Sequence, residues 1–375
     1  MKRYDAVVVG AGPAGGAAAY HLAKRGHGVL VLEQAAWPRY KPCGGGVSPQ
    51  VAQWFDFDWT PAISLKVSQI RYTWKLGDPV QVALQLDEPV WMVRRDVFDA
   101  YLIRQGQGLG VEFWPQTQVT GVTATADGWQ VHTDQGDFWG SYVVAADGAK
   151  GLMPKWLGFK ERKVRIATAL EVEAPVTSPE TAAIHFDFGS VQNGYLWNFP
   201  KADGYSIGAG TFRGTEKQDL RQVAQEYARQ FQVDMTALKP YGHPLRLWDG
   251  HQPLHTQRAL LAGEAACVVD PFTAEGIRPA LLSGMLAAIA ISAALQGDEG
   301  ALPRYTEQIQ TQWGEDMAWA QRLGGVFYRF PGVAYRVGVK RPAASKRMAQ
   351  VLAGEIRYRD VAEAAIKRLS GGLLG

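Results

Sequence analysis

The hydrophobic pattern at the start of the chain predicts a β-α-β unit. An apolar run over residues 4–9 leads into a glycine-rich segment over residues 10–15, and an alanine-rich helical stretch follows it. A second apolar run, residues 28–32, ends at Glu33. Short apolar runs bounded by glycine are typical of buried parallel strands. The chain therefore begins with a strand, a tight turn, a helix and a second strand.

Strands and helices are predicted along the rest of the chain as well. Alternating apolar and polar residues predict strands over residues 65–92, 111–146 and 164–248. Two turns interrupt these strands, at Gly77-Asp78-Pro79 and at Asp127-Gly128. Helical spacing predicts helices over residues 48–55, 95–105 and 216–231, and from Pro303 to the end. Residues 37–46 hold too much proline and glycine for a regular element, so we expect a loop there.

Composition and length are typical of a globular protein with two or three domains. The 375 residues are 47% hydrophobic and 20% charged. Cys43 and Cys267 cannot form a disulfide framework and show no metal-ligand spacing with histidine, so we expect a reducing compartment and no metal site. The first strand leaves no room for a leader before residue 4, which predicts a cytoplasmic protein. The longest apolar stretch, residues 280–295, predicts a buried helix, because a membrane-spanning helix needs about twenty apolar residues.

Positive charge is concentrated at the C-terminal end. The net charge is +3, yet residues 321–375 hold eleven Lys and Arg against three acidic residues, an excess of +8 that leaves −5 for the rest. Aromatic and aliphatic residues lie among these cations, which suits peripheral contact with an anionic membrane surface. The alternative is a solvated helical face packed on the main body. We expect a small-molecule substrate and no nucleic-acid partner.

The glycine-rich turn after the first strand has the spacing of a dinucleotide-binding site. Gly10 allows the tight turn, Gly12 lets a diphosphate approach the backbone, and Gly15 lets the helix pack closely on the strand. The helix N-terminus offers N–H groups and a dipole that favour an anion. Glu33 stands about twenty residues past the glycines, where a carboxylate binds ribose hydroxyls. We therefore expect an adenine dinucleotide.

Three further segments favour a flavin over a nicotinamide cofactor. Arg95 begins a predicted helix, where its guanidinium reaches the diphosphate or the ribityl oxygens. Asp147-Gly148 closes a predicted strand. The third segment, residues 263–277, begins with Gly263-Glu264 and forms a glycine-containing turn before the long apolar helix. N–H donors at such a helix N-terminus stabilise a reduced anionic flavin.

The order of these segments resembles that of the p-hydroxybenzoate-hydroxylase-type flavoproteins. Within that group the sequence is most similar to the geranylgeranyl reductase family. Lys41-Pro42-Cys43-Gly44-Gly45 is similar to the Cys-Gly-Gly loop of that family, and residues 195–200 are similar to its Y-x-W-x-F-P motif. The resemblance covers residues 5–280, about three quarters of the chain.

The resemblance implies a role for each matching residue. The ADP half of FAD is implied to contact Gly10, Gly12, Pro13, Ala14, Gly15, Glu33 and Arg95. The rest of the cofactor is implied to contact Asp147, Gly263, Glu264, Asp270, Pro271, Gly276 and Ile277. Cys43 and Gly44 are implied to lie by the isoalloxazine on the substrate side, and Tyr195, Trp197 and Phe199 to border a prenyl chain. Glu264 departs from the aspartate usual in the family, which shifts the ribityl contact outward or routes it through water.

The predicted fold class is α/β, mixed with α+β. A Rossmann-type FAD-binding domain is interleaved with a β-sheet substrate domain, and a basic helical segment ends the chain. The FAD-binding domain comprises residues 1–62, 90–160 and 250–300, the substrate domain residues 63–89 and 161–249, and the C-terminal segment residues 301–375.

These observations predict a FAD-dependent reductase that saturates C=C bonds of a prenyl chain by hydride transfer, with electrons from NADPH or reduced ferredoxin. An unactivated alkene also needs a proton, and the candidate catalytic donors are Cys43, Tyr195 and an ordered water. A flavin monooxygenase or halogenase of the same fold and a non-catalytic flavin- or pigment-binding assembly protein at a membrane remain alternatives. Structural roles also remain open: Cys43 as an inert small residue, Tyr195 and Trp197 as core, and Arg95 as a surface ion pair.

Overall fold

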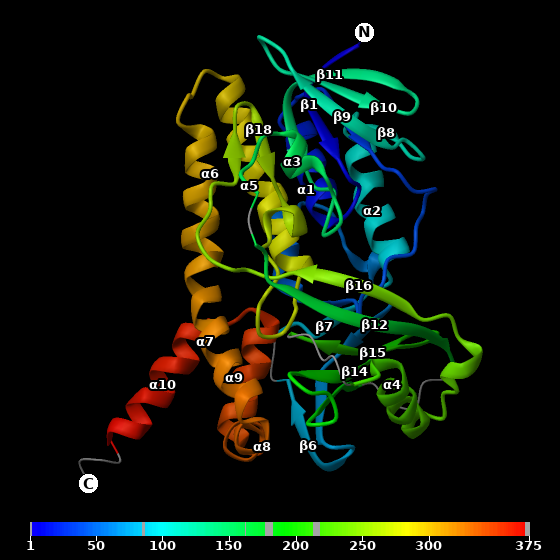
Figure 1. Cartoon of the computed structure of the whole chain (residues 1–375), viewed down its shortest axis with the longest axis vertical. Coiled ribbons are helices and arrows are strands. Elements are labelled where there is room, and N and C mark those ends of the chain that lie inside the picture. Colours follow the sequence, from blue (N-terminus) through cyan, green and yellow to red (C-terminus); the bar gives the residue numbers. More distant parts are fainter. Residues whose placement is uncertain (1, 85–86, 162, 177–182, 213–217, 372–375) are drawn as a thin grey trace.

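A mostly parallel sheet carries the glycine-rich turn (Figure 1). The computed structural model describes residues 2–84, 87–161, 163–176, 183–212 and 218–371. The strand order of this sheet is β17-β18-β11-β1-β2-β8, and the hairpin of β9 and β10 joins it through β11. Its strands are β1 (Arg3–Val9), β2 (Val29–Leu32), β8 (Glu112–Trp114), β9 (Val119–Ala124), β10 (Trp129–Thr133), β11 (Gly136–Ala145), β17 (His255–Thr256) and β18 (Ala259–Leu261). The turn between β9 and β10 contains Asp127-Gly128, as predicted.

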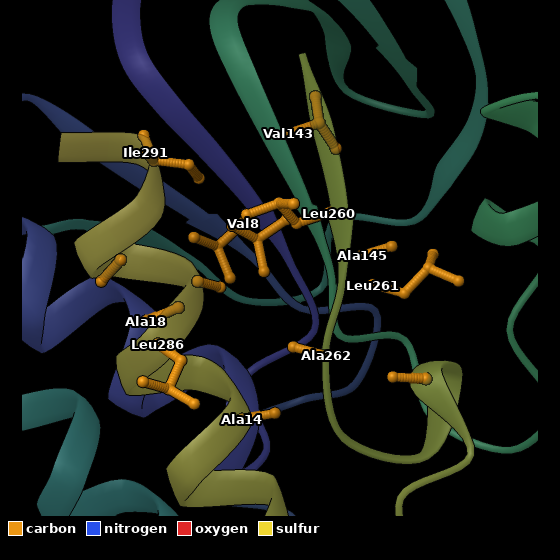
Figure 2. Packing of buried hydrophobic residues seen from close by; sticks show 14 of the residues in the cluster. Val8, Ala14, Ala18, Val143, Ala145, Leu260, Leu261, Ala262, Leu286 and Ile291 are labelled. Atoms are coloured by element: carbon orange, nitrogen blue, oxygen red, sulfur yellow. The ribbon is translucent and has the colours of Figure 1, made fainter. Parts of the chain in front are cut away.

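Two alanine-rich helices pack on this sheet. Figure 2 shows Val8 and Leu260 from the strands near Ile291 and Leu286 of α5 (Ile277–Leu295), with α1 (Pro13–Ala23) alongside. The helices approach closely because a Cβ on Gly284 would lie only 2.1 Å from the Ala14 carbonyl oxygen. Helix α2 (Arg95–Gln107) packs beside α1.

Helix α5 is the buried helix that the sequence predicts. Among the described residues it is the one helix long and apolar enough to cross a membrane, but 72% of its apolar window is buried inside the protein. A helix that is apolar all round is typical of the core of a large protein. Helix α5 therefore belongs to the core of the half that contains the first sheet.

A second sheet of seven strands lies below the first in Figure 1, and its order is β16-β12-β15-β14-β13-β5-β6. Its neighbours are antiparallel except for β5 and β13, which are parallel. Helix α4 (Leu220–Ala228) packs against β15. The strands are β5 (Gln69–Trp74), β6 (Gly77–Ala83), β12 (Ile166–Pro175), β13 (Ala183–Phe188), β14 (Gly194–Lys201), β15 (Gly204–Thr211) and β16 (Tyr241–Arg246). A small sheet of β3 (Gly46–Val47), β7 (Val90–Met92) and β4 (Leu65–Val67) is separate from both.

The turn between β5 and β6 corrects the sequence prediction. It consists of Lys75-Leu76, so the predicted turn at Gly77-Asp78-Pro79 is wrong and those residues begin β6. Lys75 and Leu76 have φ angles of 51° and 65°, as a two-residue hairpin turn requires. The Asp187 carboxylate accepts the Leu76 N–H at 2.7 Å. This contact from β13 stabilises a turn at residues 75–76, whereas the local sequence favours a turn at residues 77–79.

Two predicted helices differ in detail from the structure. Residues 48–55 contain a 3₁₀ helix, Pro49–Trp54, in place of an α-helix. The helix predicted over 216–231 is α4 followed by a 3₁₀ turn over Arg229–Phe231, and residues 216 and 217 lie outside the described part. Asp219 caps α4 by accepting the Arg221 N–H at 2.9 Å.

The C-terminal segment is helical over its described residues, as predicted. It comprises α6 (Ala301–Ile309), a π turn (Gln310–Gly314), α7 (Glu315–Arg329), α8 (Pro331–Ala334), a second π turn (Tyr335–Val339), α9 (Pro342–Ala353) and α10 (Tyr358–Gly371). The buried Tyr335 donates a hydrogen bond to the Asp78 carbonyl at 2.6 Å. Val339 and Ala349 pack in one cluster with Ile70 and Ile184 of the seven-stranded sheet. Helices α6, α7 and α9 therefore pack on the main body, while α10 runs outward from it toward the C-terminus (Figure 1).

Candidate functional site

One cavity of about 1310 Å³ is lined by the first sheet, the seven-stranded sheet and the C-terminal helices. It contains most of the residues that the sequence singles out. The predicted site residues that line it are Gly10, Gly12, Pro13, Ala14, Glu33, Cys43, Gly44, Arg95, Asp147, Tyr195, Trp197, Phe199, Gly263, Glu264, Gly276 and Ile277. Gly15, Asp270 and Pro271 do not line it.

The glycine turn between β1 and α1 leaves the N-terminus of α1 open to the cavity. Gly10 has φ +102°, and a Cβ there would lie 2.3 Å from the Ala146 carbonyl oxygen. A Cβ on Gly15 would lie 1.8 Å from the Gly10 carbonyl oxygen, so Gly15 shapes the turn from behind. No side chain caps α1 at Gly12. The first-turn N–H groups are therefore available to an anion.

Two arginines lie next to this helix N-terminus. A Cβ built on Gly12 would lie 3.6 Å from an Arg39 Nη and 3.9 Å from an Arg95 Nη. The buried Asp99 carboxylate holds both, with Arg39 Nη1 at 3.0 Å and Arg95 Nε and Nη2 at 2.9 and 2.8 Å. Burial lowers the pKa of Arg95, but Asp99 and then Cys43 raise it above its usual range. Two fixed positive charges beside open N–H groups suit a diphosphate.

Arg39 is a candidate site residue that the sequence prediction missed. It lies in the irregular loop after β2, where no motif marks it. Glu33 orients it by accepting its Nε–H at 3.4 Å, and its guanidinium lies 5.3 Å from the Trp37 ring centroid. The Glu33 carboxylate also accepts the Ala11 and Ala35 N–H groups at 3.0 Å. Glu33 therefore sits at the end of β2, where the ribose of a dinucleotide binds.

Two carboxylates farther along the cavity have unpartnered oxygens. Within the described residues, Asp147 Oδ1 and Glu264 Oε1 are buried without a hydrogen-bond partner. The other Asp147 oxygen accepts the Met153 N–H at 2.8 Å, and burial raises the pKa of Asp147 to about 6. Buried acceptors of this kind normally find a donor. Both line the cavity beyond the α1 N-terminus, so they fit the hydroxyl groups of a ribityl chain.

Glu264 has a second set of partners that the sequence does not reveal. Its Oε2 accepts a hydrogen bond from Lys41 Nζ at 2.9 Å and lies 3.2 Å from His243 Nε2. Burial by itself would raise the pKa of Glu264. The opposing effect of Lys41 and His243 is larger, and the pKa is lowered to about 2. The longer side chain at this position therefore joins the 41–45 loop to β16 as well as facing the cavity.

The residues of the loop before α5 divide into those that shape the loop and those that line the cavity. The buried Asp270 carboxylate accepts the Phe272 N–H at 2.7 Å and the Tyr358 hydroxyl at 2.6 Å, so it shapes the loop and anchors α10. Gly276 precedes α5 without a side-chain cap, and Gly276 and Ile277 line the cavity. A second open helix N-terminus thus faces the same cavity, as a flavin ring edge requires.

The loop of Cys43, Gly44 and Gly45 is held tightly between the two halves. A Cβ on Gly44 would lie 2.8 Å from Phe199 Cδ2, and one on Gly45 would lie 2.1 Å from a backbone oxygen. The Lys201 ammonium donates to the Gly44 carbonyl. Glycine is therefore needed at position 44 for close packing against Phe199 of β14, and at position 45 for close packing against the Val93 backbone.

Glu171 on β12 lies directly behind this loop and is also absent from the sequence prediction. Its Oε1 accepts the Cys43 N–H at 2.7 Å and the Tyr40 hydroxyl at 3.1 Å, while Oε2 is buried without a partner in the described part of the chain. Burial, and next the negative charge of Glu173, raise the pKa of Glu171 to about 7. Burial likewise lowers the pKa of Lys201 to about 8, although both glutamates oppose this.

The far end of the cavity is apolar. Tyr195, Trp197 and Phe199 alternate along β14 and line it together, with Phe186 and Phe188 of β13. Tyr195 donates its hydroxyl hydrogen to the Thr273 carbonyl. Trp197 Nε1 is buried without a partner among the described residues. The placement of these aromatic residues along one face agrees with the alternation of a strand.

The C-terminal helices close the opposite side of this apolar end. Residues of α7 and of the segment after it line the cavity, an arrangement that the sequence prediction missed. Tyr328 donates to the Phe272 carbonyl at 2.8 Å, and the Phe327 ring lies 5.0 Å from that of Phe188. The lining residues from this segment include Leu323, Val326, Phe327, Tyr328, Val337, Val339, Met348 and Leu352.

Comparison with known proteins agrees with this geometry. The sequence profile of the family described as "FAD binding domain" matches residues 3–313. The chain belongs to this family. Its predicted fold class is confirmed, and it is a FAD-dependent oxidoreductase of the geranylgeranyl-reductase-like group, as the sequence predicts.

Three proteins illustrate the similarity to known sequences and structures. An uncharacterized protein of Methanosarcina barkeri is 31% identical over 88% of this chain and 84% of its own length. Digeranylgeranylglycerophospholipid reductase 1 of Methanothermobacter thermautotrophicus is 28% identical over 85% of each chain. A solved structure from Thermoplasma acidophilum, described as geranylgeranyl bacteriochlorophyll reductase-like, has a TM-score of 0.79 and 22% identity, covering 88% of each chain.

Proposed function

We propose that this protein is a reductase that saturates C=C bonds in the prenyl chain of a lipid or diphosphate. The observation that carries the proposal is that one cavity joins a dinucleotide-binding end to an aromatic and aliphatic end. A cavity of about 1310 Å³ is larger than the roughly 300–1,000 Å³ typical of a small-ligand site. The similarity to a digeranylgeranylglycerophospholipid reductase supports a prenyl substrate.

The residues at the polar end bind and orient the cofactor. Arg39, Arg95 and the N-terminus of α1 would hold the diphosphate, and Glu33 would hold the ribose. Asp147 Oδ1 and Glu264 Oε1, which are buried without a partner among the described residues, would accept hydrogen bonds from the ribityl hydroxyls. When bound, FAD supplies hydride from its reduced ring. NADPH or reduced ferredoxin is the proposed source of the electrons.

The residues at the apolar end bind the chain and exclude water. Tyr195, Trp197 and Phe199 form one wall, and Phe327 with Tyr328 forms the opposite wall. Burial raises the pKa of Tyr195, with smaller contributions from Asp270 and Cys43. Because its hydroxyl hydrogen is also committed to a backbone carbonyl, Tyr195 is better suited to positioning than to proton donation.

The proton required by the alkene is held at Glu171. Glu171 lines the same cavity as Cys43, and its Oε2 is buried without a partner in the described part of the chain. Burial, and then the charge of Glu173, raise the pKa of the carboxyl to about 7, so that it can hold a proton near neutral pH. The Cys43 backbone N–H donates to this carboxyl, and the Cys43 side chain interacts with Arg95. Glu171 therefore joins Cys43 as the proposed acid of the reaction.

An anaerobic single-turnover experiment tests the proposal. The FAD-loaded protein is reduced chemically, a geranylgeranyl substrate is added, flavin reoxidation is followed by absorbance, and the lipid is analysed by mass. We expect reoxidation together with a gain of two hydrogens for each double bond lost. A gain of one oxygen atom in air would instead favour the monooxygenase alternative, and flavin that no isoprenoid reoxidises would favour the assembly protein.

A further inference from the structure

Four large apolar side chains are exposed close together on the C-terminal helices. Val326, Phe330, Val333 and Val337 have exposed fractions of 64%, 55%, 61% and 50%. They lie within twelve consecutive residues, where backbone hydrogen bonds join Phe330 to Val326 and Ala334 to Phe330. The other exposed large apolar residues of the described chain are scattered over distant elements. A contiguous apolar patch of this kind marks an interaction site, whereas single exposed residues do not.

Two of the four patch residues lie at an opening of the cavity. Val326 and Val337 are at least half exposed, and both also line the cavity. Phe327 and Met348 are less exposed and line the same cavity, as does the aromatic wall of the seven-stranded sheet. The apolar end of the cavity therefore reaches the surface between α7 and the π turn that follows α8.

The surface around this opening is positively charged. Residues 317–354 contain seven Lys and Arg and no Asp or Glu. Arg322 and Arg329 line a shallow hollow together with Val326 and Phe330, which places cations directly beside the apolar side chains. Arg336, Lys340 and Arg341 are exposed nearby, and Lys340 also pairs with Asp78 at 2.8 Å. Cations near an anionic bilayer surface are attracted to it.

We propose that Val326, Phe330, Val333, Val337 and the surrounding arginines form a surface that docks on an anionic lipid bilayer. Cations beside inserted apolar side chains suit the boundary between phosphate headgroups and acyl chains. A second copy of the chain would meet the same positive charge and be repelled. Docking would place the opening against the bilayer, so that a prenyl lipid enters the cavity without crossing water. This last step, and only this step, rests on the proposed function.

A flotation experiment tests the docking. The full-length FAD-loaded protein is mixed with vesicles of phosphatidylcholine alone or of phosphatidylcholine with phosphatidylglycerol. We expect flotation with the anionic vesicles and a sharp loss of binding in high salt. The double variant Phe330→Asp/Val333→Asp is expected to bind at least about tenfold more weakly, because each substitution replaces an apolar side chain that leaves water on docking with an anionic one that the bilayer repels.

The matched control is Leu109→Asp, which places the same charge at a residue that is 45% exposed but distant in the sequence. It should float like the unchanged protein. An unaltered flavin absorption spectrum in every variant checks that each is folded. Equal binding by the double variant, equal binding to neutral vesicles, or a dimer that the double variant abolishes without any vesicle binding would overturn the proposal.

Two substrates separate this proposal from the proposed function. The double variant should turn over a detergent-dispersed prenyl diphosphate like the unchanged protein, but lose at least about tenfold in rate with a vesicle-embedded prenyl lipid. Equal rates on both substrates would overturn lipid access through this opening. If the unchanged protein reduces neither substrate, the proposed function fails, and flotation alone still decides the docking.

Discussion

At the scale of single residues, Arg39 is the clearest test of the cofactor end. Its guanidinium lies beside Gly12 and shares Asp99 with Arg95. We expect Arg39→Ala to weaken FAD binding about 10- to 100-fold, because a hydrogen bond to a charged group contributes about 1.5–3 kcal/mol. Fluorescence titration of the apoprotein with FAD measures this. Arg104→Ala, on the exposed side of the same helix α2, is the control and should bind FAD normally.

A second prediction at this scale concerns pH. If Glu171 supplies the proton, the rate of alkene-dependent flavin reoxidation is highest where the carboxyl is protonated and falls as pH rises through about 7. Glu171→Gln keeps the shape of the side chain but cannot transfer a proton. The rate should therefore fall about 100-fold or more, and the remaining rate should no longer depend on pH in this way. Stopped-flow absorbance over a pH series provides the measurement.

Glu173→Gln is the matched variant for this prediction. The charge of Glu173 raises the pKa of Glu171, so its removal should move the fall in rate to lower pH while leaving the rate at low pH high. A residue that merely supports the fold would not move the profile. An unchanged profile in both variants would contradict a proton held at Glu171.

At the scale of elements, the contact between α1 and α5 fixes the cofactor turn. A Cβ on Gly284 would lie 2.1 Å from the Ala14 carbonyl oxygen, a backbone atom that cannot yield without moving the helix. We expect Gly284→Ala to lower the free energy of unfolding by about 1–3 kcal/mol. Gly325→Ala in α7 meets nothing within 4 Å and should instead raise it by about 0.5–1 kcal/mol. Chemical denaturation of both variants measures this, and the same sign for both would contradict the packing described.

The elements also show what the sequence could predict. The β-α-β unit, the Asp127-Gly128 hairpin and helix α5 depend on local signals, namely short apolar runs, turn residues and a long apolar stretch, so the sequence predicts them. The turn at Lys75-Leu76 depends on Asp187, more than one hundred residues away, so it was predicted at the wrong position. Arg39 and Glu171 belong to no motif, and only the packing of distant strands and loops brings them to the cavity.

At the scale of the whole molecule, the cavity is a joint product of three parts of the chain. Helices α1 and α5, which pack on the first sheet, contribute two open N-termini. The seven-stranded sheet contributes an aromatic wall, and the C-terminal helices contribute the facing wall. The sequence marks the first two by motifs. The third appears in the sequence only as a basic segment, because its role depends on Tyr335 and Tyr358 anchoring it to the body.

The central claim is that one cavity holds FAD at its polar end and a prenyl chain at its apolar end. A crystal structure of the protein with FAD and a saturated prenyl product tests it most directly. We expect the diphosphate beside Gly12, Arg39 and Arg95, the flavin ring between Gly44 and Gly276, and the prenyl chain between Trp197 and Phe327. A prenyl chain bound outside this cavity, or a flavin ring separated from it by closed protein, would contradict the account.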